Sequence, residues 1–496
     1  MSNHPPALLE PEVAGKLLQK ALEKADKQPL APLTVADAAT RSGLSLRDAE
    51  RGLHWLSAEY RGALRVTDQG ELLFVFPHGF AQPWVTRDAV SRFFDRAGHV
   101  LAGVGRFVVR AWLTVVLLAY VAIFLAVVIG LTVAQSNGNN RSRGNFGGGL
   151  VFVVLRVLGD ALFWTFHPFS PFAYRTYGYG YGGQRSSWAP RPARKNKGDE
   201  IPFYEKVNRF FFGPPPPEVD PLEQQRRILA EIRAGKGRVG LADVMRVTGL
   251  PREQVDPMMA RLMVDYDGDV SVSSEGGITY HFEALRKTAE ESAVQASPEP
   301  AWNHAPELAP LTGNEGGTNF LIVLLNGFNL VMSLVALGNG WTIENLIQLF
   351  QPPRLQHFTP GLPIALGVVP LVFSAALFLI PIVRAALRPA RAKKVAKERG
   401  RLALLRVVLN KIGEKQPITE PALVTAYRKA SGLDPDDKEL TRELVRLGGD
   451  VQIGAEGQVR YRFADLETEA AALEAEREAA EDEEQRPGKV VFSSDE

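Results

Sequence analysis

Two residues of opposite charge, Arg156 and Asp160, stand inside an apolar segment of the chain. Their i, i+4 spacing puts both side chains on one face of a helix, where they can pair. An unpaired charge at the centre of a bilayer costs about 2.5–3.5 kcal/mol. The pair is therefore either a self-neutralising contact, in a helix that crosses the bilayer or lies at its surface, or a polar site in a pathway for a solute. We expect the contact.

Residue types that carry most enzyme chemistry are absent or badly spaced. The chain has no cysteine, which excludes disulfides, thiolate metal sites, cysteine-ligated iron–sulfur clusters and cysteine nucleophiles. No two of its eight histidines have metal-ligand spacing. The run Gly147-Gly148-Gly149 lacks the Lys-Ser/Thr of a phosphate-binding loop, and no Gly-x-Ser-x-Gly sequence occurs. We therefore expect no enzyme activity, no catalytic residues, no metal site and no cofactor.

Four apolar segments of membrane length alternate with charged stretches, although the chain as a whole is balanced, with 57 basic and 56 acidic residues among 496. The first segment, 111–134, is uncharged, and a helix of that length covers about 36 Å, enough for a hydrocarbon core of about 30 Å. The others are 149–167, 318–338 and 361–385. The third contains Asn326 and Asn329, two further polar residues of a span.

Lysine and arginine near the segment ends predict the orientation. They are dense before the first segment, after the second and after the fourth. The two opposite loops hold only Arg141, Arg143 and Arg354. With four crossings, all three flanks that are rich in lysine and arginine lie on the same side of the membrane. The sequence therefore predicts a multi-pass protein of the cell inner (plasma) membrane, in contact with the lipid bilayer, with both termini cytoplasmic.

Outside the apolar segments, three stretches align without a gap. They are GALRVTDQGELLFVF (62–76), GDVSVSSEGGITYHF (268–282) and GDVQIGAEGQVRYRF (449–463). Alternating apolar residues around a central glycine predict a β-hairpin in each. Each follows helical patterns, the last of them at 45–60, 251–266 and 434–447. Helix, helix, helix, hairpin is the order of a winged-helix domain, so the fold class expected is an α-helical membrane protein with three small α+β winged-helix-like cytoplasmic modules.

The charge of the third helices bears on nucleic acid as a partner, because that helix enters the major groove in winged-helix proteins that read DNA. DNA carries a negative charge about every 1.7 Å, so a groove-reading helix should be basic. The first two helices each have two basic and three acidic residues, and the third has three basic and five acidic. Pro257 is also expected to interrupt the second. We expect protein partners rather than nucleic acid.

The remaining stretches connect these modules. Residues 86–110 have apolar and basic faces and predict an interfacial amphipathic helix. The tail is acidic and rich in alanine, which predicts a solvated helix. The full set of expected boundaries is 1–85 (module 1), 86–110 (interfacial helix), 168–217 (basic and aromatic loop with a second interfacial helix), 218–286 (module 2), 287–316 (linker), 398–465 (module 3) and 466–496 (acidic tail).

The stretch PFYEKVNRFFFGPPPPEVDPLEQQRRILAEIRAGKGRVGLADV, residues 202–244, is followed by the hairpin sequence YDGDVSVSSEGGITYHF. Together they resemble a family of integral membrane proteins of cyanobacteria and chloroplasts whose roles are poorly characterised. Some plant members carry an iron–sulfur-cluster-biosynthesis label. This chain has no cysteine to supply thiolate ligands, so that label is not transferred. The family implies no catalytic residues.

Three functions remain open. The first is a membrane scaffold or assembly factor whose modules dock cytoplasmic proteins, with a homo-oligomer also left open. The second is a membrane-tethered DNA-binding regulator, against which the acidic third helices count. The third is a small-solute channel or transporter lined by Arg156, Asp160, Asn326 and Asn329, against which the small number of polar groups counts. We expect the scaffold.

Overall fold

The computed structural model describes residues 8–25, 31–77, 79–80, 111–131, 201–216, 220–289, 296–348, 357–453, 459–480 and 487–494. The chain divides into two compact units. The first combines Met1–Thr86, Glu218–Glu307 and Arg391–Glu496. The second combines Arg87–Pro217 and Leu308–Ala390. The expected interfacial helix at 86–110 and the expected second span at 149–167 lie outside the described residues.

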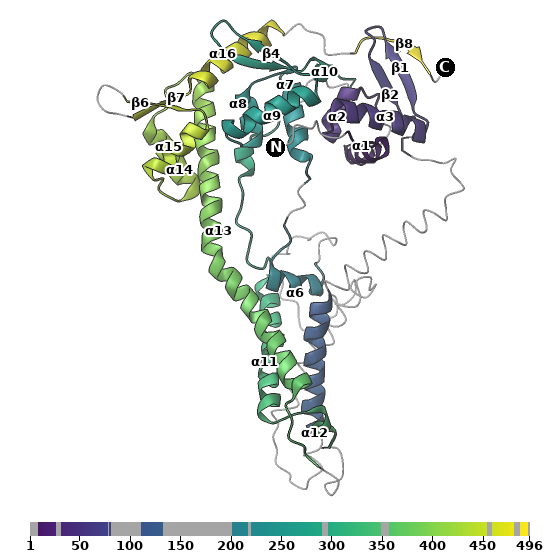
Figure 1. The fold of residues 1–496 in the computed structure, drawn as a ribbon, viewed down its shortest axis with the longest axis vertical. Helices are drawn as coiled ribbons and strands as arrows, with labels where there is room; N and C mark the ends of the chain where they lie inside the picture. The colour runs from purple at the N-terminus through teal and green to yellow at the C-terminus, as the bar shows by residue number, and fades with distance from the viewer. Residues whose placement is uncertain are drawn as a thin grey trace, which may run out of the picture. The chain divides into compact units, whose positions relative to one another are not determined.

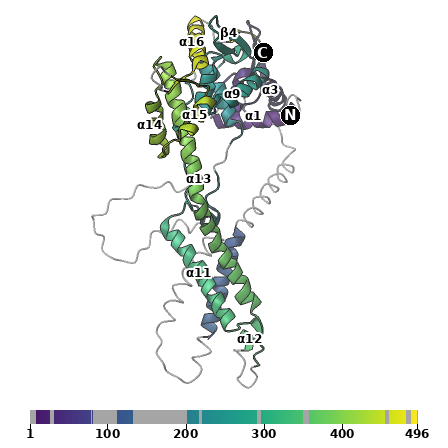
Figure 2. The ribbon, with the colours of Figure 1, turned by 60° about the vertical axis from the view of Figure 1, so that its left-hand side comes forward.

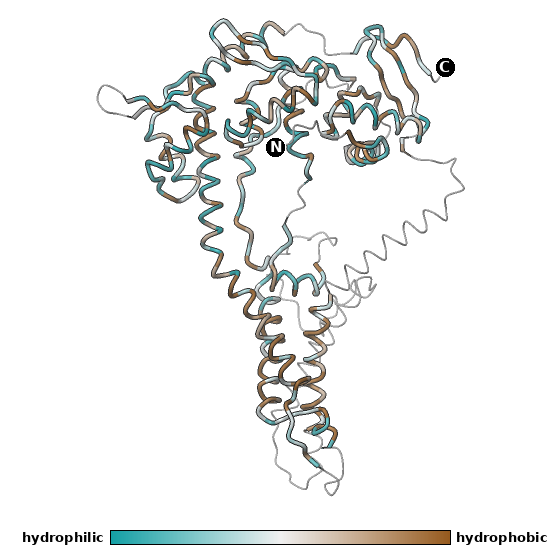
Figure 3. The backbone as a smooth tube through the Cα atoms, in the orientation of Figure 1, coloured by the Kyte–Doolittle hydropathy of each residue, from teal (hydrophilic) through white to brown (hydrophobic). Residues whose placement is uncertain are grey.

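Among the described residues, three helices are long and apolar enough to cross a membrane. They are Ala111–Leu131, α11 (Gly316–Gly338) and the helix that begins at Ile364, and they form the apolar part of the second unit in Figure 3. A short helix, α12 (Ile343–Gln348), follows α11. These helices confirm the first, third and fourth apolar segments as candidate spans.

The helix α6 (Phe203–Phe212) packs against the apolar helices of the second unit. Its buried Val207 and Phe211 belong to one hydrophobic cluster with Leu117. Arg384 donates to the main-chain carbonyl of Phe211 at 3.0 Å and so caps the end of α6, where the last carbonyls lack helical partners. Gly213 is required there, because its φ is +90° and a Cβ would collide with the Arg384 guanidinium.

The helix α13 (Val369–Gly413) is continuous over 45 residues and follows a π-helical turn, η4 (Ile364–Val368). It begins in the second unit and ends in the first. The sequence predicted a span that ends at 385 and a module that starts at 398, but both belong to this one helix. Pro381 and Pro389 lie inside it without ending it. A proline inside a helix removes one hydrogen bond and its ring crowds the carbonyl four residues earlier, so the rest of the helix must offset that cost.

Subdomain 1 (residues 8–80) of the first unit has three helices and a hairpin. Its elements are α1 (Pro11–Ala25), α2 (Val35–Ser42), α3 (Leu46–Tyr60), β1 (Ala63–Thr67) and β2 (Leu72–Val75). A capping box starts α2: the Asp37 N–H donates to Thr34 Oγ1 and the Thr34 N–H donates to Asp37 Oδ2, each at 3.0 Å. Gly43 ends α2 in the left-handed conformation.

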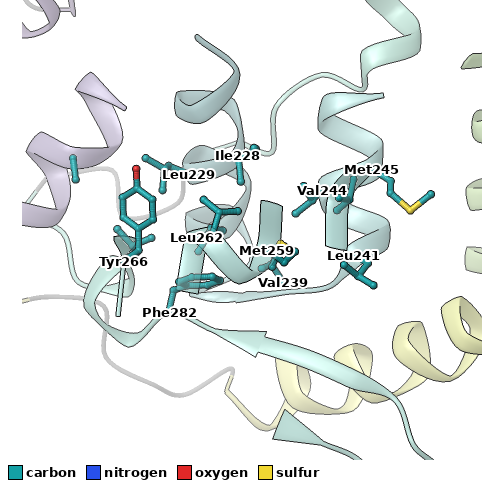
Figure 4. Packing of buried hydrophobic residues seen from close by; sticks show 14 of the residues in the cluster. Ile228, Leu229, Val239, Leu241, Val244, Met245, Met259, Leu262, Tyr266 and Phe282 are labelled. Carbon is teal, nitrogen blue, oxygen red and sulfur yellow. The ribbon is translucent and has the colours of Figure 1, made fainter. Parts of the chain in front are cut away.

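Subdomain 2 (residues 220–289) has the same order of helices and hairpin, with a short added strand and a short added helix (Figure 1). Its elements are α7 (Glu223–Ala234), β3 (Arg238–Val239), α8 (Leu241–Thr248), α9 (Arg252–Asp265), β4 (Asp269–Val272), β5 (Ile278–His281) and α10 (Glu283–Arg286). Both neighbours of β5, which are β3 and β4, are antiparallel to it. The expected interruption at Pro257 is wrong, because α9 continues through it. Apolar residues of α7, α8, α9 and the strands enclose the core in Figure 4.

Subdomain 3 (residues 402–463) uses the end of α13 as its first helix. It continues with α14 (Glu420–Ser431), α15 (Asp437–Arg446), β6 (Asp450–Ile453) and β7 (Val459–Arg462). The two strands are antiparallel, with Asp450 opposite Arg462. Leu404, Leu444 and Phe463 are fully buried in a hydrophobic cluster that also contains core residues of the other two subdomains.

Two elements of the C-terminal tail, α16 and β8, contact the other subdomains. The helix α16 (Ala464–Ala479) buries Leu466, Glu469 and Leu473 and contacts α8, β3 and β5. Figure 2 shows α16 next to β4, which belongs to the same sheet as β3 and β5. The strand β8 (Val490–Ser493) pairs antiparallel with β1, with Phe492 opposite Val66. Part of the expected linker, 287–316, is bound to subdomain 2, because Arg246 of α8 donates to the Pro298 carbonyl at 3.2 Å. Long-range contacts therefore order two stretches whose composition alone predicted solvation.

Candidate functional site

The two polar span residues predicted from sequence, Asn326 and Asn329, lie buried in α11. The Asn326 Nδ2 group donates to the main-chain carbonyl of Ser374 in α13 at 3.0 Å. The Asn329 Nδ2 group donates to the carbonyl of Leu117 in the helix Ala111–Leu131 at 2.9 Å. The two amides thus hold α11 to two different helices, which favours a packing role over the lining of a pathway. Arg156 and Asp160 lie outside the described residues.

We expect Asn329→Ala to lower the stability of the second unit by about 0.6–2 kcal/mol, the range measured for hydrogen bonds between membrane helices. The check is the unfolding midpoint of the full-length protein in detergent. Asn339→Ala is the matched control, because the Asn339 amide is exposed at the end of α11 and donates within its own helix. Equal midpoints for both variants would contradict the packing role.

The third helices of subdomains 2 and 3 contact each other. Arg446 at the end of α15 pairs with Glu253 in the first turn of α9, at 3.3 Å from Nε to Oε2. Arg252, the first residue of α9, pairs with Asp465 of α16 at 2.6 Å. The N-terminal end of α9 is therefore engaged by protein. A DNA groove would have to displace these contacts before it reached that end of the helix.

Subdomains 1 and 2 are joined by a buried ion pair. Arg233 Nη2 lies 2.7 Å from Asp37 Oδ1, and the two side chains are 4% and 0% exposed. The Thr288 hydroxyl donates to the same carboxylate at 2.6 Å and the Ala289 N–H at 3.1 Å. Burial alone would raise the pKa of Asp37, but the Arg233 charge and the hydrogen bonds outweigh it and lower that pKa. Asp37 is therefore an ionised, fully partnered carboxylate that caps α2 and holds subdomain 2.

A second buried carboxyl, that of Glu469 in α16, has a pKa shifted in the opposite direction. Its Oε1 accepts the Ala242 N–H at the start of α8 at 2.9 Å. Burial raises the pKa of Glu469 to about 8, and the neighbouring charge of Asp243 adds to the rise. The main-chain hydrogen bonds and Arg252 counteract only part of it. The docking of α16 on subdomain 2 therefore depends on a carboxyl group that favours its neutral form.

The hairpin β4–β5 has one covered and one exposed face. Glu476 of α16 accepts from the Thr279 hydroxyl at 2.8 Å and lies 2.8 Å from His281 Nε2. On the other face Val270, Val272 and Ile278 are 41%, 64% and 40% exposed. We call these three residues the hairpin face. Two exposed acidic residues, Asp269 and Glu275, belong to the same hairpin.

Sequence reasoning did not identify Asp37, Arg233 or Glu469 as important residues. For Asp37 a signal was present, because Thr34-x-x-Asp37 has the spacing of a capping box. For Glu469 a weaker one exists: Leu466, Glu469 and Leu473 share one helical face, so the face that carries the leucines also carries a carboxyl group. Arg233 had no local signal, because its partner is remote in sequence.

The chain is distantly similar to an uncharacterised chloroplast protein of Arabidopsis thaliana. The two are 24% identical over 272 residues, which are 53% of this chain and 47% of the plant protein. The chain thus spans about half the length of the curated relative it matches. No family model and no solved structure matches the chain. Among the described residues, no group of three or more histidine, aspartate or glutamate side chains could hold a metal ion.

Proposed function

We propose that the chain is a membrane-anchored scaffold that binds a protein partner through the hairpin face. The observation that carries the proposal is the exposure of Val270, Val272 and Ile278 on a strand pair whose opposite face is covered by α16. Apolar side chains that cluster on an exposed surface among polar ones are typical of protein contact sites. Glu275, exposed in the turn between the two strands, favours a partner with a basic residue beside its apolar contact residues.

The order of three helices and a hairpin supports the proposal that each subdomain is winged-helix-like. The acidic third helices and the contacts of α9 with subdomain 3 favour protein over DNA as the partner. The Asn326 and Asn329 hydrogen bonds between helices give the transporter alternative no support. The basic flanks of the spans support an inner-membrane location with the first unit and both termini in the cytoplasm.

Two matched valines test the hairpin face. Val270→Lys places a positive charge on the face that we expect to meet a basic partner, whereas Val451→Lys makes the same change on β6 of subdomain 3. Val270 and Val451 are 41% and 44% exposed, so both changes should be tolerated by the fold. The tagged full-length protein is cross-linked in its membrane and co-purified proteins are quantified. We expect Val270→Lys to reduce recovery of one specific protein at least tenfold, about 1.4 kcal/mol of binding.

Equal recovery from Val270→Lys and Val451→Lys would contradict a partner site on the hairpin face. Co-purification of duplex DNA at about 0.15 M salt would promote the membrane-tethered regulator instead, because binding that persists at that ionic strength requires several phosphate contacts.

A further inference from the structure

The strand β8 shows how an extended segment binds the outer edge of a hairpin in this protein. It pairs antiparallel with β1, beside which it lies in Figure 1. The Leu64 N–H donates to Ser494 Oγ at 2.8 Å, and the Leu64 carbonyl accepts the Ser494 N–H at 2.9 Å. The side chains of Val490, Val491 and Phe492 all stay exposed. The pairing therefore rests largely on main-chain groups, as is usual when a strand is added to the edge of a sheet.

The hairpin β4–β5 has the same register and the same turn as the hairpin β1–β2. Val66 lies opposite Leu72, and Val272 lies opposite Ile278. In each turn a glycine N–H donates to the carbonyl three residues earlier at 3.0 Å. Each residue of β4 therefore has an equivalent in β1, and Val272 is the equivalent of Val66.

The outer edge of β4 lacks the neighbour that β1 has. Among the described residues the strand order is β3-β5-β4, so β4 is an edge strand. The Ser273 N–H donates inwards to the Gly277 carbonyl. Main-chain groups alternate in direction along a strand, so those of Val270 and Val272 point outwards. The Val270 N–H donates to the exposed carboxylate of its own neighbour Asp269 at 2.8 Å, whereas its equivalent in β1 donates to β8.

A strand added to β4 would also extend an apolar row of the hairpin face. In the first hairpin this row runs from Leu72 through Val66 to Phe492, because Val66 lies opposite both. Val66 is partly buried there. In the second hairpin the row ends at Val272, which is 64% exposed. Side chains directly opposite each other on neighbouring strands pack together, so an apolar residue of an added strand would cover Val272.

We propose that the outer edge of β4 binds an extended segment of the partner protein as an added antiparallel strand. The segment takes the place beside β4 that β8 has beside β1, with an apolar or aromatic residue opposite Val272. Glu275 in the turn favours a basic residue at the near end of the segment. In β8 that end holds Lys489, whose carbonyl accepts the Asp68 N–H at 2.8 Å. The inference rests on the proposed function, because it specifies how the partner of the hairpin face binds.

A first test changes only the added strand. The probe is a labelled synthetic peptide of residues 487–494, PGKVVFSS, and the protein is the full-length chain in lipid nanodiscs. Binding is measured by fluorescence anisotropy. N-methylation of the amide that matches Ser494 should weaken binding about fivefold or more, because one main-chain hydrogen bond is lost. N-methylation at Ser493 is the matched control, because that N–H points away from the edge, and the wild-type protein is the same in both cases.

A second test changes β4 in the full-length protein. Val272→Pro removes an outward N–H, and proline is tolerated in an edge strand at such a position. Val272→Ala is the control, because it shortens the side chain and keeps the N–H. We expect Val272→Pro to weaken peptide binding about fivefold or more relative to Val272→Ala, and to reduce recovery of the co-purified partner in the same order. The urea unfolding midpoint of each variant separates a folding defect from a binding defect.

Peptide binding that is insensitive both to N-methylation at Ser494 and to Val272→Pro would overturn strand addition. If Val270→Lys loses the co-purified protein while Val272→Pro and Val272→Ala recover it equally, the hairpin face binds through side chains alone, and the proposed function stands without this inference. Equal recovery from Val270→Lys and Val451→Lys would instead remove the proposed function and this inference with it. Self-association of the full-length protein that Val272→Pro abolishes would assign the edge to a second copy and overturn the partner segment.

Discussion

Asp37→Ala is expected to lower the free energy of unfolding of the first unit by about 3–5 kcal/mol, the cost of leaving a buried charge without its partner. The change leaves the Arg233 guanidinium buried without its ion-pair partner, since the Arg233 side chain is 4% exposed. It also removes the acceptor for the Thr288 hydroxyl and one half of the capping box of α2. The measurement is urea unfolding of the full-length protein in detergent, followed by tryptophan fluorescence, since Trp55 packs against the core of the first unit.

Two variants serve as controls for Asp37. Glu12→Ala removes the exposed pair of Glu12 with Lys16 and should cost less than about 1 kcal/mol. The double variant Asp37→Leu/Arg233→Met replaces the ion pair by apolar side chains and should recover much of the loss, because no charge is then buried alone. If Asp37→Ala unfolds at the same urea concentration as Glu12→Ala, the buried pair does not hold the two subdomains together.

The pH dependence of this contribution has a definite sign. The pKa of Asp37 is lower in the folded protein than the ordinary value of 3.8. The stabilisation is therefore present above about pH 4 and is lost as the pH falls through the folded pKa. We expect the difference between wild type and Asp37→Asn to be constant near neutrality and to shrink only in acid.

Raising the pH is expected to loosen α16 from subdomain 2. The pKa of Glu469 rises from 4.5 to about 8 on folding, so the folded state holds a proton that the unfolded state releases. The stabilisation is complete below about pH 4.5 and is lost as the pH rises towards 8. Within that window each pH unit removes about 1.4 kcal/mol. Urea midpoints measured at pH 6 and pH 8 should therefore differ clearly.

Glu469→Gln tests the cause of that loss. Glutamine keeps an oxygen that accepts the Ala242 N–H but does not ionise, so the urea midpoint of this variant should change little between pH 6 and pH 8. Glu478→Gln, an exposed change on the same helix, should leave the wild-type dependence unaltered. The pair of Glu476 with His281 is intact in both variants, so it does not distinguish them. A pH dependence that persists in Glu469→Gln would contradict Glu469 as its cause.

The sequence alone predicts the elements whose cause is local. Apolar runs of membrane length predict candidate spans at 111–134, 318–338 and 361–385, because the length and apolar character of a span are properties of neighbouring residues. The hairpins at 62–76, 268–282 and 449–463 follow from strand alternation around a turn glycine. Pro257 shows the limit of such local rules. Tertiary packing maintains α9 through a residue that disfavours a helix on its own.

Only the tertiary structure reveals the contacts between residues far apart in the chain. The partner of Asp37 is Arg233, and the N–H group that Glu469 accepts belongs to Ala242. Neither pair can be recognised in the sequence, because its two partners lie far apart in the chain and meet only when the chain folds. The acidic tail shows the same effect: composition predicts solvation, yet α16 buries Leu466 and Leu473 and contacts α8, β3 and β5 of subdomain 2. Whether a charged residue is solvated, paired or left neutral depends on the dielectric and the partners that the fold places around it.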